Sequence, residues 1–306
     1  MTKKFVQPRD RGGYKEHPYV IPHMTLDEYA PKFKDFFTFK RENGILEAKF
    51  HTNGDSLVWS AQVHRALWQL CTYVGQDMDN EILIFGGTGK NWIAGQDENT
   101  TMSEEENRDW MIYDHMFYDG TNICEGFIFD LEIPTIGVIN GPGFHTEMAL
   151  FCDITLMADN GFIIDPHYEA GMVPGDGIQI AFRECMGLKR ANYAMLMCEK
   201  LDAKKCLDYG MVNEIMPPDK VYDRAWEIAR KLMTKKRAMR RTTVQILRAP
   251  WKEALAKELR FAFGMEMMVT ATDKPEHSND AWNDLTEEQK KNMAKNAEEM
   301  AKRHGK

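Results

Sequence analysis

The stretch Ile133–Gly177 constrains this chain more than any other part of the sequence. It holds two apolar, β-branched runs, and each run is followed by a Gly/Pro-rich loop. Each loop carries a histidine with a carboxylate nearby: His145 with Glu147, and His167 with Asp176. In α/β proteins ligand sites form where strands end and loops begin, and histidine is the side chain most often used for proton transfer. Two such loops in one segment favour an enzyme.

Composition excludes several other classes of protein. The 306 residues include 43% hydrophobic residues, enough for a sizeable core, and the net charge of -8 argues against a nucleic-acid binder. No apolar run approaches the ~20 residues that span a membrane, and the first 18 residues lack the apolar region of a secretory signal. The six cysteines form no C-x-x-C pair, which indicates reduced thiols in a cytoplasmic protein.

Hydrophobic periodicity predicts strands and helices that alternate along the chain. An Asn43-Gly44 pair predicts a hairpin between Phe36–Lys40 and Ile45–His51. Further strands are predicted at Glu81–Gly86, Thr135–Asn140, Ile154–Ala158 and Phe162–Ile164. Helices are predicted at Ser60–Val74, Ile178–Met186, Arg190–Cys198, Ala203–Tyr209, Tyr222–Met233 and Trp251–Thr272, and from Ser103 through Ile123. This order is typical of an α/β fold with a largely parallel sheet.

The same reading divides the chain into four parts. Residues 1–35 are predicted to form an extended N-terminal arm and residues 36–215 an α/β core. Residues 216–275 are predicted to form a helical C-terminal region. Residues 276–306 are predicted to form a charged helical tail, in which Thr286 and Gln289 make a capping-box pattern.

Four motifs, in order, resemble the crotonase superfamily of enoyl-CoA hydratases and isomerases. They read GTGKNWIAGQD, IPTIGVINGP…E…CDI, PGDG and LDAKKCLDYGMVNEI, and the resemblance covers roughly residues 36–272. Within the superfamily the chain is most similar to β-diketone hydrolases of the 6-oxocamphor hydrolase type. The residues shared in kind are Ser56-Leu57-Val58-Trp59, His145, Glu147, Pro166-His167, Val173–Gly177 and Glu266.

The resemblance implies a crotonase-like spiral of ββα units with a helical C-terminal trimerisation region. It also implies a homotrimer or a dimer of trimers, with no metal and no cofactor. Two departures from the ordinary superfamily pattern matter. Gly143-Phe144-His145 stands where other members carry three glycines, and His167 stands where the hydratases carry a second catalytic glutamate, while Glu147 matches the first.

These residues suit the hydrolysis of a cyclic β-diketone to a keto acid by retro-Claisen chemistry, which needs a base, an acid and hydrogen-bond donors. We assign His167 as the base toward water, with Asp176 accepting from its other ring nitrogen, as in a Ser-His-Asp triad. His145 would hold the leaving enolate. The remaining candidates are Glu266 and Glu147 to orient water or histidine, Trp59 as an apolar wall, and Gln96, whose backbone N–H matches an oxyanion donor of the superfamily and whose partner position is Phe144.

Each candidate residue also has an ordinary structural explanation. His145 can be a packed histidine bonded to Glu147, Trp59 a core aromatic, and Glu147 a helix N-terminal charge. The GGTGK turn lacks phosphate-loop spacing, because Ile84 stands at the first glycine position. No H-x-x-x-H or H-E-x-x-H pair predicts a metal site.

Two other functions stay open at this point. The chain could be a CoA-thioester hydratase, isomerase or decarboxylase, or a non-catalytic binding protein on the same fold. The basic cluster Lys235–Arg241 keeps the CoA alternative open, since such residues can contact phosphates. Its structural interpretation is a solvated helix end or an intersubunit patch.

Overall fold

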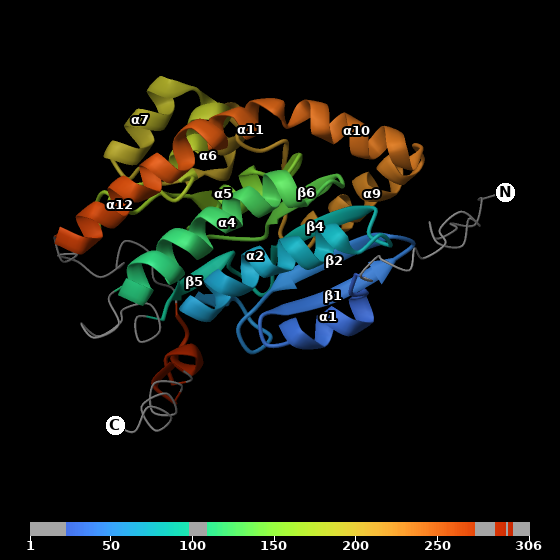
Figure 1. The fold of residues 1–306 in the computed structure, drawn as a ribbon, viewed down its shortest axis with the longest axis horizontal. Helices are drawn as coiled ribbons and strands as arrows, with labels where there is room; N and C mark the ends of the chain where they lie inside the picture. Colours follow the sequence, from blue (N-terminus) through green and yellow to red (C-terminus); the bar gives the residue numbers. More distant parts are fainter. Residues whose placement is uncertain (1–22, 98–108, 273–284, 292, 296–306) are drawn as a thin grey trace.

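A six-stranded sheet forms the centre of the computed structural model, which describes residues 23–97, 109–272, 285–291 and 293–295 (Figure 1). The strand order is β1-β2-β4-β6-β7-β10; β1 and β2 are antiparallel, and the other neighbours are parallel. The strands are β1 (Phe37–Glu42), β2 (Ile45–Phe50), β4 (Ile82–Gly87), β6 (Thr135–Ile139), β7 (Ile154–Ala158) and β10 (Glu214–Met216). The predicted α/β class with a largely parallel sheet is confirmed.

Helical segments follow most of these strands and dominate the last third of the chain (Figure 1). The α-helices are α1 (Leu26–Phe33), α2 (Ala61–Gln76), α4 (Gly120–Glu125), α5 (Glu147–Leu150), α6 (Ile178–Met186), α7 (Leu188–Leu196), α8 (Ala203–Asp208), α9 (Val221–Met233), α10 (Arg237–Leu247), α11 (Ala249–Ala254) and α12 (Arg260–Thr272). The π-helical segments are η3 (Trp110–Asp119), η4 (Gly126–Asp130) and η5 (Leu255–Leu259). The predicted helices at 60–74, 178–186, 190–198, 203–209, 222–233 and 251–272 are confirmed within a few residues.

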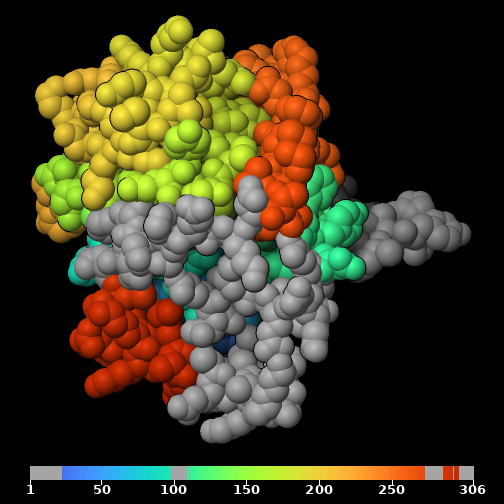
Figure 2. All heavy atoms as spheres, turned by 90° about the vertical axis from the view of Figure 1, so that its left-hand side faces the viewer, coloured from blue at the N-terminus to red at the C-terminus, as the bar shows by residue number. Residues whose placement is uncertain are grey.

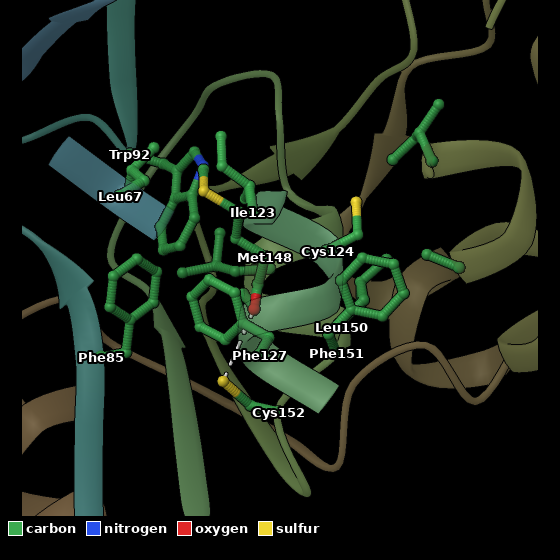
Figure 3. Packing of buried hydrophobic residues seen from close by; sticks show 14 of the residues in the cluster. Leu67, Phe85, Trp92, Ile123, Cys124, Phe127, Met148, Leu150, Phe151 and Cys152 are labelled. Carbon is green, nitrogen blue, oxygen red and sulfur yellow. Dashed lines mark hydrogen bonds between the residues drawn. The ribbon is translucent and has the colours of Figure 1, made fainter. Parts of the chain in front are cut away.

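Helices cover both faces of the central sheet. On one face α9 packs against a cluster that includes Ile82, Ile84 and Val138. On the other face α2, α4 and η4 lie side by side over a larger core (Figures 1 and 3). Neighbouring residues of β4 alternate between the two clusters, because successive side chains of a strand point to opposite faces of the sheet. Since both faces are covered, the strand is apolar at nearly every position.

The predicted hairpin between β1 and β2 is confirmed. Glu42 pairs with Ile45 at the last register position, so the connection is the two-residue Asn43-Gly44 loop. Both residues have positive φ, 51° and 85°. This is the backbone of a type I′ turn, whose twist matches that of the flanking strands.

Two small sheets carry side chains toward the candidate site. β3 (Leu57–Trp59) pairs in parallel with β5 (Ile93–Gln96), which places Trp59 beside Gln96. β8 (Phe162–Ile163) pairs with β9 (Leu201–Asp202). The sequence predicted a strand at β8 but not at β3, which is three residues long and entirely buried, so it shows no alternation of buried and exposed positions.

The prediction of an extended arm is wrong for its last part. Leu26–Phe33 forms α1, and Tyr29 and Phe33 are buried against Tyr73. Glu28 accepts a hydrogen bond from the Thr25 backbone at 2.7 Å, so a T-x-x-E pattern at the helix start is the signal that was missed. Residues 1–22 lie outside the described residues, as does the Ser103 end of the predicted helix.

The basic cluster at Lys235–Arg241 is not simply a solvated helix end. Arg237 donates to Glu81 at 2.7 Å, and Arg240, also bonded to Glu81, is buried. Glu81 lies next to the start of β4, so these pairs attach α10 to the central sheet. The local pattern could not predict this contact, because α10 and the start of β4 lie more than 150 residues apart in the sequence.

The described part of the tail contacts the body through a buried residue, Gln289. Residues 287–291 are helical, and Thr286 and Gln289 form the predicted capping box. Gln289 also donates to the backbone oxygen of Ser56 at 3.1 Å. Figure 2 shows these residues (red) at the opposite end of one face from α12 (orange). No helix among the described residues is long and apolar enough to cross a membrane.

Candidate active site

A cavity of about 120 Å³ gathers every site residue predicted from the sequence. Its walls come from the ends of β3 and β5, the loops after β6 and β8, η3, and α12. The predicted residues that line it are Trp59, Gln96, Phe144, His145, Glu147, His167, Asp176 and Glu266. The additional lining residues are His64, His115, Met116, Ile164, Asp165, Pro166, Met172, Ile178, Phe263 and Thr270.

His145 is held in an uncommon backbone conformation between β6 and α5. Its φ is 52°, in the left-handed region that L-residues seldom adopt. The Trp92 indole N–H donates to its backbone oxygen at 3.3 Å, and Gly143, two residues earlier, leaves no room for a side chain against Ile93. A strained residue of this kind persists where the surrounding structure holds it, often at a functional site.

Two side chains flank the His145 imidazole. The Trp59 indole stacks on this imidazole with ring centroids 4.2 Å apart and ring planes at 23°. The Nδ1 atom of His145 bonds to Glu147 Oε1 at 3.1 Å. Trp59 is thus both a core residue and a wall of the cavity. Glu147 is the first residue of α5, so the predicted roles as a histidine partner and a helix-start charge are met together.

The partner of the other imidazole is Asp165, which the sequence argument did not select. Asp165 Oδ1 lies 2.6 Å from His167 Nδ1 and also accepts the His167 backbone N–H at 3.1 Å. The signal was the local Asp-Pro-His order, since Asp before proline starts a turn and accepts from the residue two positions on. Asp165 is 1% exposed.

The triad analogy predicted that Asp176 accepts a hydrogen bond from the second ring nitrogen of His167, and this is wrong, because Asp165 takes that position. Asp176 Oδ2 lies 3.7 Å from His167 Nε2 and 3.2 Å from His145 Nδ1, so it sits between the two imidazoles. Its Oδ1 accepts the Ile178 backbone N–H at 3.2 Å at the start of α6. The Oδ2 atom is buried and has no hydrogen-bond partner among the described residues.

Glu266 reaches the site from α12. Its Oε2 accepts the Gly175 backbone N–H at 3.1 Å, and its Oε1 lies 4.0 Å from His167 Nε2. The helix approaches so closely that a Cβ on Gly175 would lie 2.4 Å from the Ala262 backbone oxygen. The buried Glu266 carboxyl group, on an otherwise apolar surface of α12, therefore has Gly175 and His167 as polar neighbours.

The electrostatics of the two histidines favour their charged forms. Burial works to lower both pKa values, but carboxylates outweigh it. Glu147 and Asp176 raise the pKa of His145 to about 10, and Asp176 and Asp165 raise the pKa of His167 well above its usual value. Burial works in the opposite direction on Asp176, but the charges of both imidazoles hold its pKa below the usual range.

The pKa values of the two glutamates shift upward, in the direction opposite to that of Asp176. Burial raises the pKa of Glu266 to about 8 and also raises the pKa of Glu147, in each case against an opposing histidine charge. Near neutral pH the cluster therefore combines charged imidazoles with at least one carboxyl group that keeps its proton. Opposite shifts among neighbouring groups are typical of acid–base sites.

A second pair of histidines, His64 and His115, also lines the cavity, and sequence patterns did not indicate it. His64 Nδ1 lies 2.9 Å from the His115 backbone oxygen, and burial lowers the pKa of His64 to about 3. His115 Nδ1 lies 3.7 Å from Asp119, which also accepts from Arg65 and Trp68. His115 belongs to η3, and π-helical segments are frequent at functional sites.

Two groups of described residues have the spacing of metal ligands. They are His64, His115 and Asp119, and His145, Glu147 and Asp176. In the first group Asp119 is already bonded to an arginine and a tryptophan. In the second group the histidine and one carboxylate bond to each other. We interpret both groups as hydrogen-bonded clusters.

A family model described as enoyl-CoA hydratase/isomerase matches residues 40–293. The short-chain-enoyl-CoA hydratase of Clostridium acetobutylicum is 26% identical over 53% of this chain and 63% of its own length. The carnitinyl-CoA dehydratase of Citrobacter koseri is 31% identical over 35% of this chain and 41% of its own length. The chain thus spans less than two thirds of these curated relatives.

Solved structures share the fold. A β-diketone hydrolase from Anabaena sp., bound to (S)-3-oxocyclohexyl acetic acid, superposes with a TM-score of 0.75 at 34% identity, covering 80% of this chain and 97% of that one. An enoyl-CoA hydratase from Mycobacterium avium subsp. paratuberculosis gives a TM-score of 0.68 at 19% identity, covering 80% and 94%. The second match supports the fold alone, and the predicted crotonase-like architecture is confirmed.

Proposed function

Because this chain belongs to the enoyl-CoA hydratase/isomerase family, the crotonase superfamily, we propose that its cavity hydrolyses a carbon–carbon bond of a small β-diketone. The observation that carries the proposal is the meeting of two imidazoles around one carboxylate. The rings of His145 and His167 lie 6.2 Å apart, with Asp176 between them. The cavity they share is small, in keeping with a small ligand.

The reaction adds one water molecule to the substrate. The water oxygen bonds to one carbonyl carbon, and its proton passes to His167 Nε2. The tetrahedral alkoxide collapses, the bond to the carbon between the carbonyls breaks, and its electron pair becomes the enolate of the second carbonyl. The charged His167 then gives the proton it took from water to that carbon, which completes a keto acid and returns the imidazole to its neutral form. His167 acts as base in its neutral form, with Nδ1 directed at Asp165.

The other side chains stabilise the negative charge that develops on the substrate or orient the water. His145, held at Nδ1 by Glu147, offers its other ring nitrogen to the enolate oxygen, where a buried cationic donor stabilises more than it would in water. Glu266, whose pKa is raised to about 8 by burial, holds the water beside His167 without adding a negative charge near neutral pH. Trp59 supplies the apolar wall behind His145.

A CoA-thioester hydratase or isomerase is the second candidate, because the curated relatives carry such names. Three observations favour the diketone. Among the described residues that line the cavity there is no lysine or arginine. Arg237 and Arg240 are engaged by Glu81 rather than left for phosphates. The third rests on the sequence resemblance, which implies that His167 stands where the hydratases carry a second catalytic glutamate.

The test is a panel of cyclic and bicyclic 1,3-diketones beside a panel of CoA esters. The diketones should include the bicyclic compound whose ring opening yields 3-oxocyclohexyl acetic acid. Chromatography would detect the keto acid. Its formation supports the proposal if crotonyl-CoA is neither hydrated nor bound. Saturable CoA-ester turnover with inert diketones would establish the second candidate instead.

We also propose that the chain assembles as a homotrimer or a dimer of trimers. Large apolar side chains are exposed on three C-terminal helices, including Leu196 of α7, Ile246 of α10 and Phe261 of α12. Exposed apolar patches of this kind mark interaction surfaces. Light scattering on the purified chain tests the proposal, and a monomer would exclude it.

A further inference from the structure

The carboxylate at position 165 is buried more completely than its surroundings explain. Asp165 is 1% exposed and its Oδ2 has no hydrogen-bond partner among the described residues. Taking a carboxylate out of water is unfavourable unless a partner compensates for it. Its shortest hydrogen bond among the described residues is with the His167 imidazole, at 2.6 Å.

Local geometry fixes which oxygen meets which nitrogen. Proline at position 166 restricts Asp165 to an extended backbone, and the side chain turns forward to accept the His167 backbone N–H at 3.1 Å. The same Oδ1 atom faces His167 Nδ1. Because a carboxylate only accepts, Nδ1 must carry the hydrogen whichever charge the ring has.

The groups that face the opposite ring nitrogen are arranged differently. Asp176 Oδ2 and Glu266 Oε1 lie 3.7 Å and 4.0 Å from His167 Nε2, too far for direct hydrogen bonds. His145 is a further titratable neighbour, and it takes the nearer contact with Asp176 at 3.2 Å. Nε2 is therefore left facing the cavity.

We propose that Asp165 is the positioning residue of this site: it holds His167 with Nδ1 protonated and Nε2 open to the reactant, while Asp176 serves both imidazoles. The kinetic consequence rests on the proposed hydrolysis, but the ring geometry does not. Replacing Asp165 should release the ring, so that Nε2–H can turn toward Asp176 or Glu266. The base would then present the wrong nitrogen, as in the carboxylate-to-amide variant of a catalytic triad.

The direct test is NMR of substrate-free protein labelled with ¹⁵N-histidine, with His167→Gln to assign the signal. A strongly hydrogen-bonded Nδ1–H gives a protected, far-downfield proton. We expect this proton in the wild type and in Asp176→Asn, and its loss in Asp165→Ala. Asp165→Asn, which keeps the shape, should fold normally and move the proton upfield because the acceptor is neutral. Persistence in Asp165→Ala, or loss in Asp176→Asn, would overturn the proposal.

Kinetics on a turned-over diketone supply the second readout. Asp165→Ala should lower kcat by about 100-fold or more, with KM changed by no more than about 3-fold, because the base is misdirected while the cavity is kept. Glu169→Gln is the matched control, because Glu169 is an exposed carboxylate two positions after His167 in the sequence, as Asp165 is two positions before it. An unchanged kcat in Asp165→Ala would refute the positioning role. Inert diketones with the expected NMR would refute only the proposed hydrolysis.

Discussion

The indole of Trp59 stacks on the imidazole of His145 with centroids 4.2 Å apart and planes inclined by 23°. Since Glu147 and Asp176 outweigh burial and raise the pKa of His145 to about 10, the ring is a cation near neutral pH. An imidazolium against an indole face gains from the negative potential of the ring system. Trp59 therefore contributes to the charge state of the site as well as to its shape.

Replacing Trp59 should weaken the charged form of His145. In Trp59→Leu we expect the pKa of His145 to fall and kcat to drop about 5-fold, from the loss of roughly 1 kcal/mol of cation–π attraction. Histidine NMR titration and steady-state kinetics would measure both effects. Trp226→Leu is the control, because Trp226 bonds Glu47 and belongs to the cluster on the other face of the sheet. An unchanged His145 titration in Trp59→Leu would contradict this explanation.

The pH dependence of the reaction follows from the two imidazoles. The base His167 must be neutral, and Asp176 and Asp165 overcome burial to raise its pKa, so kcat/KM should rise with pH through a midpoint above the usual 6.5. It should fall again as His145 loses its proton at about pH 10. Asp176→Asn removes the largest charge that raises the pKa of His167, so its lower limb should shift to lower pH. A lower limb that stays fixed in Asp176→Asn would assign it to another group.

The backbone at His145 separates strain from chemistry. At φ 52° a glycine avoids the clash that any L-residue meets. His145→Gly and His145→Ala lose the same imidazole, so both should lose most activity, but the glycine variant should be more stable by about 1 kcal/mol. Urea unfolding of the two variants measures the difference. Equal stabilities would show that the loop relaxes when the imidazole is removed.

Arg248 should be the main anchor between the C-terminal helices and the sheet. It is 1% exposed and donates to Asp153 at 2.6 and 2.8 Å and to the Ile133 backbone oxygen at 3.0 Å. Arg248→Met leaves Asp153 without its cation, and breaking a buried pair costs about 3–5 kcal/mol. Denaturant unfolding would measure the loss. Arg224→Met, at an exposed ion pair, should leave the midpoint nearly unchanged.

Short-range patterns in the sequence predicted most of the architecture. The Asn43-Gly44 hairpin, the strands of the sheet centre and the start of α6 all follow from residues within a few positions of each other. The two histidine loops were each predicted to follow a strand, and they do follow β6 and β8, which a parallel bridge between Gly143 and Ile163 brings side by side. His145, Glu147, His167 and Asp176 therefore line the same cavity.

Pairings across long sequence distances could not be predicted in the same way. The contact of Glu266 with Gly175 joins residues 91 apart, and β3 meets β5 with no alternation to mark either strand. Asp165 was missed for a different reason. A carboxylate two residues from His167 was available, but whether it or Asp176 bonds the ring depends on how the loop turns after β8.

The central claim is that water attacks a diketone carbonyl, and isotope incorporation tests it most directly. With an active cyclic 1,3-diketone in H₂¹⁸O, mass spectrometry should find one ¹⁸O per turnover in the carboxylate of the keto acid. His167→Gln should lower the rate by about 10²–10⁴-fold while the fold is kept, as expected for loss of a general base. A wild-type protein that forms no labelled keto acid from any diketone, while hydrating a CoA ester, would contradict the account.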